Sequence, residues 1–209
     1  MHLYFATIDA LSPDTFQNHL LKLPDFERSK VAKYHRPQDA YLSVLGKALL
    51  MKGLSNYGYD ADLKANYKLT AFGRPYLLNG PGFNISHSSD VAVCVIAENK
   101  IGVDVEKVRD IELDGFADYF SPAEWDSIQR ATNPFVEFYT LWCKKEAVIK
   151  ADGKGLSNSL EKVVTLTDKT ELSGNIYYTR MHLIHPDYIV ATAYTSDHEV
   201  TNSVKIITI

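Results

Sequence analysis

Two short stretches of this chain place acidic and basic side chains at spacings suited to phosphate chemistry. Glu146 and Lys150 are one helical turn apart in residues 138–150, where apolar residues recur at three- and four-residue intervals. Asp104 and Glu106 alternate with apolar residues in an earlier stretch, which indicates a β-strand with both carboxylates on one face. A helix beside that strand would bring three carboxylates and an ammonium group together.

The carboxylates suggest a metal site. Two acids about 6–7 Å apart on one strand face repel each other unless a cation lies between them. Magnesium takes hard oxygen ligands, usually one or two carboxylates, with water and substrate phosphates completing its shell. Asp104 and Glu106 are therefore candidate magnesium ligands, and Glu146, if brought to the same site, would supply a third oxygen donor or a base. The plainer alternatives are a solvated strand end and an ordinary helical Glu–Lys pair worth about 0.2–0.5 kcal/mol.

Several further side chains could bind phosphate. Ser86 and His87 lie where a strand is entered, and backbone N–H groups with a hydroxyl can accept an anion there. Arg74 lies between glycine and proline, which fixes its guanidinium on a rigid turn. Arg28 and Lys30 belong to a helical stretch, where the simpler interpretation is a solvated face.

Helix and strand signals alternate along the chain. Serine followed by proline is typical of a helix start, and it occurs at Ser12 and Ser121. Short β-branched runs indicate strands, and Gly73 marks a turn between extended pieces at 69–77. The predicted helices are 13–21, 25–34, 39–57, one opening at Ser121 and 138–150; the predicted strands are 2–8, 91–97, 101–105, 163–167, 175–185, 188–194 and 204–209.

A weak internal repeat suggests the domain organisation. Residues 87–97 resemble residues 185–195, and each follows a long helix that carries Lys47 or Lys145 at a matching position. Chance similarity between apolar strands explains this echo about as well. A helix followed by antiparallel strands, occurring twice, predicts an α+β fold of two halves, residues 1–106 and 107–209, with a cleft between them.

Composition excludes several classes of protein. The chain has 209 residues, is 45% hydrophobic and carries a net charge of −4, so it has no bulk attraction for nucleic acid or anionic membranes. Cys94 and Cys143 lack the spacing of a zinc site or disulfide framework, which fits a reducing cytoplasm. No apolar stretch reaches the roughly 20 residues of a membrane span, and the N-terminus lacks a basic leader. We expect a soluble, unprocessed monomer.

The ordered motifs carry a resemblance. They are Phe-Asn-Ile-Ser-His-Ser at 83–88, Gly-Val-Asp-Val-Glu-Lys at 102–107, Phe-Ser-Pro-Ala-Glu at 120–124, and Trp-Cys-Lys-Lys-Glu-Ala-Val-Ile-Lys at 142–150 followed by Gly-Lys-Gly-Leu at 153–156. In this order they resemble the 4′-phosphopantetheinyl transferases, specifically the Sfp-like, pseudo-dimeric group. The resemblance covers residues 27–156 and implies two similar α+β halves related by a pseudo-twofold axis, with the active site in the cleft between them.

The resemblance also implies roles for the acidic site. Asp104, Glu106 and Glu146 are similar to the magnesium ligands that hold the pyrophosphate of coenzyme A. Lys150 resembles the lysine that contacts this pyrophosphate. The resemblance therefore implies Asp104, Glu146 and Lys150 as the catalytic residues, with Glu146, or a metal-bound water molecule that it orients, as the base.

A second set resembles the coenzyme A-binding positions of the family. Ser86 and His87 match the pair near the nucleotide phosphates, with His87 toward the 3′-phosphate. Arg74 follows glycine in the family's Gly-Lys/Arg-Pro turn, and Lys30 with Arg28 resembles a basic group before the long helix. Two positions stand apart: Ser43 occupies a site that is often a small hydroxyl or a basic residue, and Glu27 replaces a lysine of some members, which would thin or redistribute the 3′-phosphate grip.

The implied reaction is attack by a serine of an apo acyl, peptidyl or aryl carrier protein on the β-phosphorus of coenzyme A, with release of 3′,5′-ADP. Two alternatives use the same residues: a magnesium-dependent nucleotide phosphodiesterase or pyrophosphatase, and a non-catalytic coenzyme A-binding protein. For the carrier, an exposed apolar patch with local cations is expected to provide docking. Phe116, Tyr119 and Phe120 are the predicted patch, although ordinary core aromatics explain them equally well.

Overall fold

The computed structural model describes residues 1–59, 62–155, 160–195 and 205–208, the last of these as backbone only. The chain divides into two compact units. Unit 1 comprises Met1–Glu98 together with the last strand, and unit 2 begins at Asn99. The predicted boundary after residue 106 therefore differs from the observed division, because the strand that contains Asp104 belongs wholly to unit 2.

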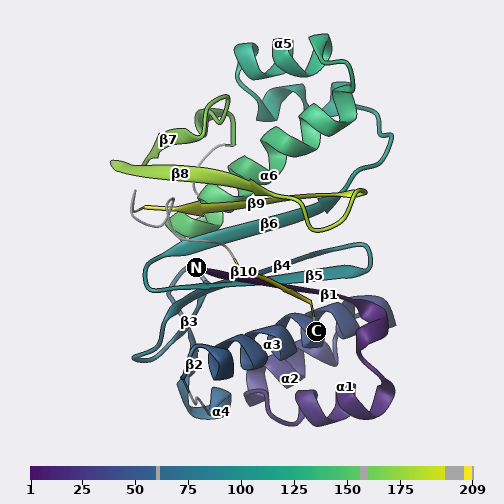
Figure 1. Cartoon of the computed structure of the whole chain (residues 1–209), viewed down its shortest axis with the longest axis vertical. Helices are drawn as coiled ribbons and strands as arrows, with labels where there is room; N and C mark the ends of the chain where they lie inside the picture. Colours follow the sequence, from purple (N-terminus) through teal and green to yellow (C-terminus); the bar gives the residue numbers. More distant parts are fainter. Residues whose placement is uncertain (60–61, 156–159, 196–204, 209) are drawn as a thin grey trace. The chain divides into compact units, whose positions relative to one another are not determined.

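Unit 1 is a four-stranded sheet with helices on one side (Figure 1). The strand order is β10-β1-β5-β4; β5 is antiparallel to both of its neighbours and β10 is parallel to β1. A separate hairpin, β2–β3, carries the turn at Gly73. The elements are β1 (His2–Thr7), η1 (Ile8–Ala10), α1 (Pro13–Leu20), α2 (Asp25–Val31), α3 (Pro37–Asn56), α4 (Leu63–Asn66), β2 (Tyr67–Leu69), β3 (Pro75–Leu77), β4 (Gly82–Ser88), β5 (Val91–Ala97) and β10 (Lys205–Thr208).

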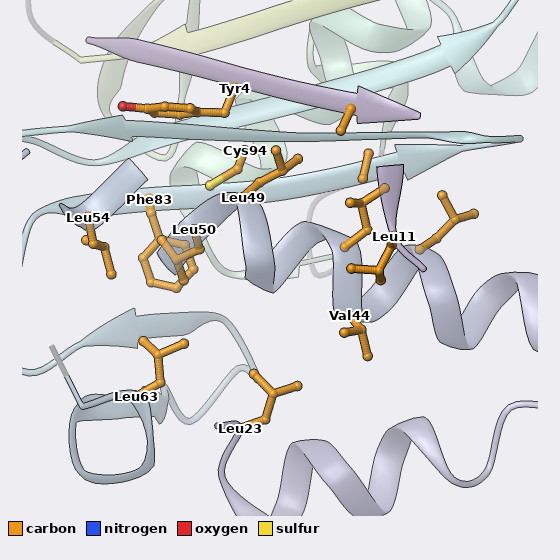
Figure 2. Packing of buried hydrophobic residues seen from close by; sticks show 14 of the residues in the cluster. Tyr4, Leu11, Leu23, Val44, Leu49, Leu50, Leu54, Leu63, Phe83 and Cys94 are labelled. Atoms are coloured by element: carbon orange, nitrogen blue, oxygen red, sulfur yellow. The ribbon is translucent and has the colours of Figure 1, made fainter. Parts of the chain in front are cut away.

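The core of unit 1 lies between α3 and this sheet (Figure 2). Leu49 and Leu50 of α3 pack near Tyr4, Phe83 and Cys94 of the sheet, and all of these side chains are buried. The predicted helix at 39–57 is thus confirmed as α3. Residues 42–50 of α3 are all buried, so this helix is covered on more than the one side that an amphipathic pattern would bury.

Unit 2 repeats this plan. Its sheet has the order β6-β9-β8-β7 with every neighbouring pair antiparallel, and α6 lies along β6 and β9. As in unit 1, a first strand precedes a short and a long helix, and a later hairpin returns to pair with it. The elements are β6 (Ile101–Lys107), η2 (Asp114–Tyr119), α5 (Pro122–Arg130), α6 (Pro134–Asp152), η4 (Leu160–Lys162), β7 (Lys169–Leu172), β8 (Asn175–His182) and β9 (Tyr188–Tyr194).

This shared order confirms the predicted α+β class with two similar units. In unit 1 the strands β1, β5 and β4 are neighbours, and in unit 2 the strands β6, β9 and β8 take the same places. The repeat suspected between 87–97 and 185–195 corresponds to the returning strands β5 and β9. No helix in the described parts of the chain is long and apolar enough to cross a membrane.

Three expectations about elements need correction. Residues 163–167 form no strand. This segment is irregular, and its backbone is bound by the side chains of Lys145 in α6 and Glu124 in α5. The stretch that holds Ser86 is not a strand entry but a complete strand, β4, which turns into β5 at Ser89 with φ 57°. The helix predicted at 138–150 is α6, which begins one turn earlier, because Asn133 caps it and Pro134 occupies its first position.

Candidate active site

Helix α6 carries the acidic and basic residues of the site on one stripe. Trp142, Glu146 and Lys150 follow one another at four-residue spacing, so their side chains share a face. The helix ends at Gly153, whose φ of 82° lies in the left-handed region and whose N–H bonds back to the carbonyl of Ile149. Lys150 therefore lies in the last turn, where a cation also stabilises the negative end of the helix dipole.

Strand β6 lies against the backbone of α6 at Gly102. A β-carbon at this position would come within 2.0 Å of the Ala147 carbonyl oxygen and 2.6 Å of the Ala151 nitrogen. Only a residue without a side chain permits this approach. Side chains alternate along a strand, so Asp104 and Glu106 project to the same side as Gly102, toward α6, as predicted.

Asp104 and Lys150 form the central contact of the site. The Lys150 Nζ donates a hydrogen bond of 2.6 Å to Asp104 Oδ1, and the Asp104 side chain is buried. Burial alone would lower the pKa of Lys150, but the neighbouring Asp104 carboxylate, followed by that of Glu146, raises it above its usual value. Lys150 is therefore a firmly held cation next to the acidic residues.

Glu146 is half-buried beside this pair. Burial raises the pKa of its carboxyl; Lys150 opposes this effect, and the charge of Asp104 adds to it. A carboxylate with a raised pKa is a stronger base than a solvated one, so Glu146 is better suited than an exposed glutamate to accept a proton. The proximity of Glu146 to Asp104 and Lys150 agrees with the sequence-based expectation that helix and strand share one site.

Glu106 of β6 also lies close to α6. It is partly buried, and its charge contributes to the raised pKa values of Tyr139 and Cys143 on that helix. Within the described residues, no group of three or more His, Cys, Asp or Glu side chains is placed to hold a metal ion. The structure instead pairs Asp104 with Lys150, so a three-carboxylate set of Asp104, Glu106 and Glu146 stays a prediction.

Unit 1 holds the predicted phosphate-binding cations around α2. Arg28 forms a surface ion pair with Asp25, and Lys30 is exposed. Lys30 is close enough to Lys47 of α3 to lower the pKa of that lysine, although burial is the larger cause. Ser43 is buried, and its hydroxyl accepts a hydrogen bond of 2.9 Å from Lys47 Nζ.

Strand β4 and the β2–β3 turn hold the remaining predicted residues. Ser86 and His87 are consecutive in β4, so their side chains project to opposite faces of the sheet; Ser86 is buried and His87 is exposed. Arg74 follows Gly73, whose φ of 79° makes the turn, and the Arg74 N–H donates to Thr70 Oγ1 at 3.1 Å. The predicted turn at Gly73 is confirmed. Ser86 and His87 cannot bind one group from the same face.

Glu27 does not lie among the exposed cations. Only 4% of its surface is exposed, and its Oε2 is 2.9 Å from the Nζ of the buried Lys47. Burial raises the pKa of the neighbouring Tyr67 phenol, and the charge of Glu27 adds to this effect. Glu27 is therefore an internal ion-pair residue, and its presence does not by itself thin the grip on a phosphate.

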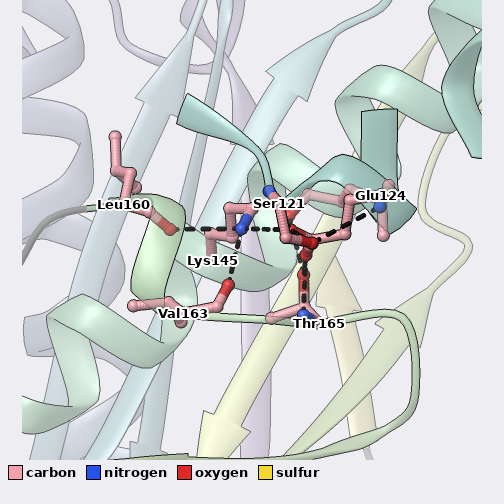
Figure 3. Close-up of polar contacts among 7 residues, drawn as sticks. Ser121, Glu124, Lys145, Leu160, Val163 and Thr165 are labelled. Atoms are coloured by element: carbon pink, nitrogen blue, oxygen red, sulfur yellow. Dashed lines mark hydrogen bonds and ion pairs between the residues drawn. The ribbon is translucent and has the colours of Figure 1, made fainter. Parts of the chain in front are cut away.

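Sequence analysis missed a buried polar network in unit 2 (Figure 3). Lys145 and Glu124 are both fully buried and form an ion pair of 2.8 Å. The capping box of Ser121 and Glu124 was visible in the sequence, but its lysine partner was not. The available signal was Lys145 itself, which lies at a four-residue interval from Leu141 and Ile149 on an otherwise apolar face.

The predicted docking patch is only partly a surface. Phe120 is buried with 3% of its surface exposed, so it is a core residue. Phe116 is half-buried and Tyr119 is 44% exposed, and each ring meets the edge or face of Trp142 at a centroid distance of 5.9 Å. The exposed part of this aromatic cluster therefore lies one turn from Glu146 along α6.

The two units together define an α+β protein in which the second unit holds an acid–base cluster. Residues 100–200 match the family model described as the 4′-phosphopantetheinyl transferase superfamily. A Bacillus subtilis 4′-phosphopantetheinyl transferase is 34% identical over 154 residues, covering 70% of this chain and 68% of that protein. The transferase Sfp of Bacillus subtilis strain 168 is 30% identical over 168 residues, covering 77% and 74% of the two chains.

Among solved structures, the holo-[acyl-carrier-protein] synthase of Thermotoga maritima matches 45% of this chain and 61% of its own, with 18% identity and a TM-score of 0.36. A match of this extent adds no weight to the assignment. The identity and coverage of the Bacillus relatives are what support the family assignment. The chain belongs to the 4′-phosphopantetheinyl transferase superfamily, and it is a transferase.

Proposed function

We propose that this enzyme transfers the 4′-phosphopantetheine group of coenzyme A to a serine of an apo acyl, peptidyl or aryl carrier protein, with release of 3′,5′-ADP. The observation that carries the proposal is the contact between Asp104 of β6 and Lys150 of α6, with Glu146 beside them, in a member of this family. A base and a cation are thereby held at one place, as transfer of a phosphoryl-linked group requires.

Each residue of the cluster has a distinct role in this proposal. Glu146, with its raised pKa, accepts the proton of the carrier serine as the hydroxyl attacks the β-phosphorus. Lys150 donates hydrogen bonds to the pyrophosphate and neutralises charge on the leaving group. Asp104 holds Lys150 in place through their 2.6 Å hydrogen bond.

Magnesium is the cofactor that these residues suit. The donor set of Asp104, Glu106 and Glu146 consists of carboxylate oxygens, which is the hard-ligand chemistry that Mg²⁺ prefers. The charge of Asp104 raises the pKa of Glu146, which indicates electrostatic crowding that a cation would relieve. When bound, Mg²⁺ would supply electrophilic stabilisation of the pyrophosphate oxygens.

We propose that residues of unit 1 bind the nucleotide part of coenzyme A. Arg28, Lys30 and Arg74 supply positive charge, and the exposed His87 ring can meet the 3′-phosphate. Ser86 and Ser43 are buried, so each either contacts coenzyme A at short range or holds a neighbouring side chain in position. We further propose that the chain acts as a monomer in the cytoplasm, which agrees with its two buried free cysteines.

The experiment is to incubate the protein with coenzyme A, magnesium and an apo carrier protein, and to weigh the carrier by mass spectrometry. We expect the carrier to gain the mass of one phosphopantetheine group and 3′,5′-ADP to appear in equal amount. Release of 3′,5′-ADP without a carrier would instead indicate the phosphodiesterase. Binding of coenzyme A without a gain in carrier mass and without release of 3′,5′-ADP would indicate a non-catalytic protein. The similarity to named transferases favours neither alternative.

A further inference from the structure

Each unit contains one buried glutamate–lysine pair at a corresponding place in its fold. In unit 1, Glu27 is the third residue of α2 and meets Lys47 in the middle of α3. In unit 2, Glu124 is the third residue of α5 and meets Lys145 in the middle of α6. We call these pairs the unit 1 latch and the unit 2 latch.

The unit 2 latch is fully bonded (Figure 3). Lys145 Nζ donates to Glu124 Oε2 at 2.8 Å and to the carbonyl oxygens of Leu160 at 3.1 Å and Val163 at 2.6 Å. Glu124 also accepts from the N–H and the hydroxyl of both Ser121 and Thr165. The network ties α5 and the segment 160–165 to one point on α6.

The bonding in the unit 2 latch outweighs the cost of burial for Glu124. Burial alone would raise the pKa of Glu124, but the bonds from Lys145, Thr165 and Ser121 lower it below its ordinary value. Burial lowers the pKa of Lys145, and Glu124 opposes that effect. In the 2.8 Å contact, each side chain therefore favours the charged form of the other.

The unit 1 latch has fewer hydrogen bonds than the unit 2 latch, but its two side chains are also buried. Lys47 Nζ lies 2.9 Å from Glu27 Oε2 and donates to Ser43 Oγ at 2.9 Å. It thereby joins α2, which carries Arg28 and Lys30, to α3, which carries Ser43. In unit 1 the latch joins two helices that carry proposed site residues, and in unit 2 it fixes α6, which carries Glu146 and Lys150.

Stability alone is a poor explanation for these pairs. A buried ion pair often stabilises a protein no more than apolar side chains of similar volume would, because both charges lose their hydration. What the charged pair adds is a fixed position and rotation of the helix, because its hydrogen bonds form only in one geometry. Sliding α6 by one residue would turn it by about 100°, and Lys145 would lose all three of its acceptors together with the orientation of its neighbour Glu146.

We propose that the two latches are positioning pairs with divided tasks: the unit 1 latch sets the residues that bind coenzyme A, and the unit 2 latch sets those that act on the reacting phosphate. This inference rests on the proposed function. It assigns no contact with substrate to any of the four latch residues. It predicts that losing one latch changes the binding of coenzyme A and that losing the other changes turnover.

The test uses two double variants of the full chain, Glu27→Gln/Lys47→Met and Glu124→Gln/Lys145→Met. Each removes both charges, so neither leaves an unpaired charge buried. With the second, we expect kcat to fall about a hundredfold with KM for coenzyme A within about threefold of wild type, as for a misplaced catalytic group. With the first, we expect KM for coenzyme A to rise about tenfold with kcat within about threefold, as for lost ground-state binding.

A matched control and a milder variant complete the design. Arg130→Ala breaks an ion pair with Asp126 on α5 whose side chains are 80% and 53% exposed, and it should leave melting temperature, kcat and KM unchanged. If a double variant does not fold, Glu27→Asp and Glu124→Asp keep the charges, shorten the reach by one methylene group and should give the same split in smaller measure.

Two results would overturn the inference. One is a folded latch variant with the kcat and KM of wild type, which would make that latch structural only. The other is the reverse assignment, in which the unit 1 variant loses turnover and the unit 2 variant loses affinity. Failure of the proposed function looks different, because then the wild-type protein itself leaves the carrier mass unchanged.

Discussion

Asp104 is the residue that connects the two elements of the proposed active site. Its side chain is buried, it accepts the hydrogen bond from Lys150, and it acts electrostatically on Glu146. A substitution here therefore affects the proposed base and the proposed phosphate-binding cation at once.

We predict that Asp104→Ala lowers the rate of carrier modification by at least about a hundredfold, the loss typical when a preorganised charged contact is removed. The measurement is the mass of the carrier over time. Asp168→Ala is the matched control, because Asp168 also pairs with a lysine of α6, Lys144, at 2.7 Å but is 78% exposed. Near-normal turnover by Asp104→Ala would contradict the assignment.

His182 predicts how stability responds to acid. It is buried and hydrogen-bonded to Thr192 at 2.8 Å, and burial, followed by the charge of Arg180, lowers its pKa to about 4. The unfolded value is about 6.5, so the fold favours the neutral ring. The resulting stability is present above pH of about 6.5 and is lost as the pH falls toward about 4.

From pH 7 to pH 5, we expect His182 to account for a loss of about 2 kcal/mol in the free energy of unfolding. The comparison is urea unfolding of wild type and His182→Gln at both pH values. Glutamine can keep the bond to Thr192 but does not titrate, so the variant should lose less stability on acidification. An identical loss in both proteins would show that another group is responsible.

At the residue scale, the sequence predicted partners that are close along one element better than partners brought together by the fold. Glu146 and Lys150 could be identified because helical spacing alone places them on one face. The pairing of Lys145 with Glu124 could not, because periodicity does not state which buried acid meets a buried lysine 21 residues away. The same limit explains why the pairing of Glu27 with Lys47 was not predicted.

At the scale of elements, the site depends on how closely β6 approaches α6. Gly102 permits this approach, because the atoms nearest to a β-carbon there belong to the helix backbone, which cannot move aside as a flexible side chain can. The position of Asp104 along the strand, two residues further on, follows from this contact. A larger residue at 102 would push the strand away from the helix.

Gly102→Ala should therefore reduce the free energy of unfolding by about 1–3 kcal/mol, the usual cost of overpacking, and lower transferase activity as well. Denaturant unfolding with the carrier assay measures both effects. Gly115→Ala is the control, because a β-carbon on Gly115 meets no atom within 4 Å. A Gly102→Ala protein as stable and active as wild type would show that the two elements can separate without harm.

The elements themselves could be predicted wherever local signals agree. Both serine-capped helices and α3 followed from caps and apolar periodicity, and β9 matches its expected bounds of 188–194. Residues 163–167 do not form the expected strand, because their backbone groups bind side chains instead of a neighbouring strand. The Val163 carbonyl accepts from Lys145, and the Thr165 N–H donates to Glu124, so no ladder forms.

At the scale of the whole molecule, the last strand belongs to the first unit. β10 pairs in parallel with β1 and forms one edge of the unit 1 sheet, although the residues that precede it, up to 195, belong to unit 2. The predicted division at 106 and 107 treated the C-terminal β-rich stretch as one block. Periodicity identifies a strand but does not show which sheet it joins.

Deleting residues 205–209 should remove the outer neighbour of β1. We expect amide hydrogen exchange to become faster in β1, whose outward N–H groups lose their acceptors, while β6, β8 and β9 keep their protection. Exchange measured by mass spectrometry or NMR distinguishes the two sheets. Unchanged protection in β1 would mean that this pairing contributes nothing to the stability of the first sheet.

The place of β10 also bears on how the protein is made in the cell. A ribosome completes residues 1–98 well before it reaches 205–208, and at about 5–20 residues per second the interval is roughly 5–20 s. During that time β1 remains an open sheet edge on the nascent chain, a place where another polypeptide can add. The first half of this enzyme to emerge is thus the last to be finished, and chaperones would meet it in that incomplete form.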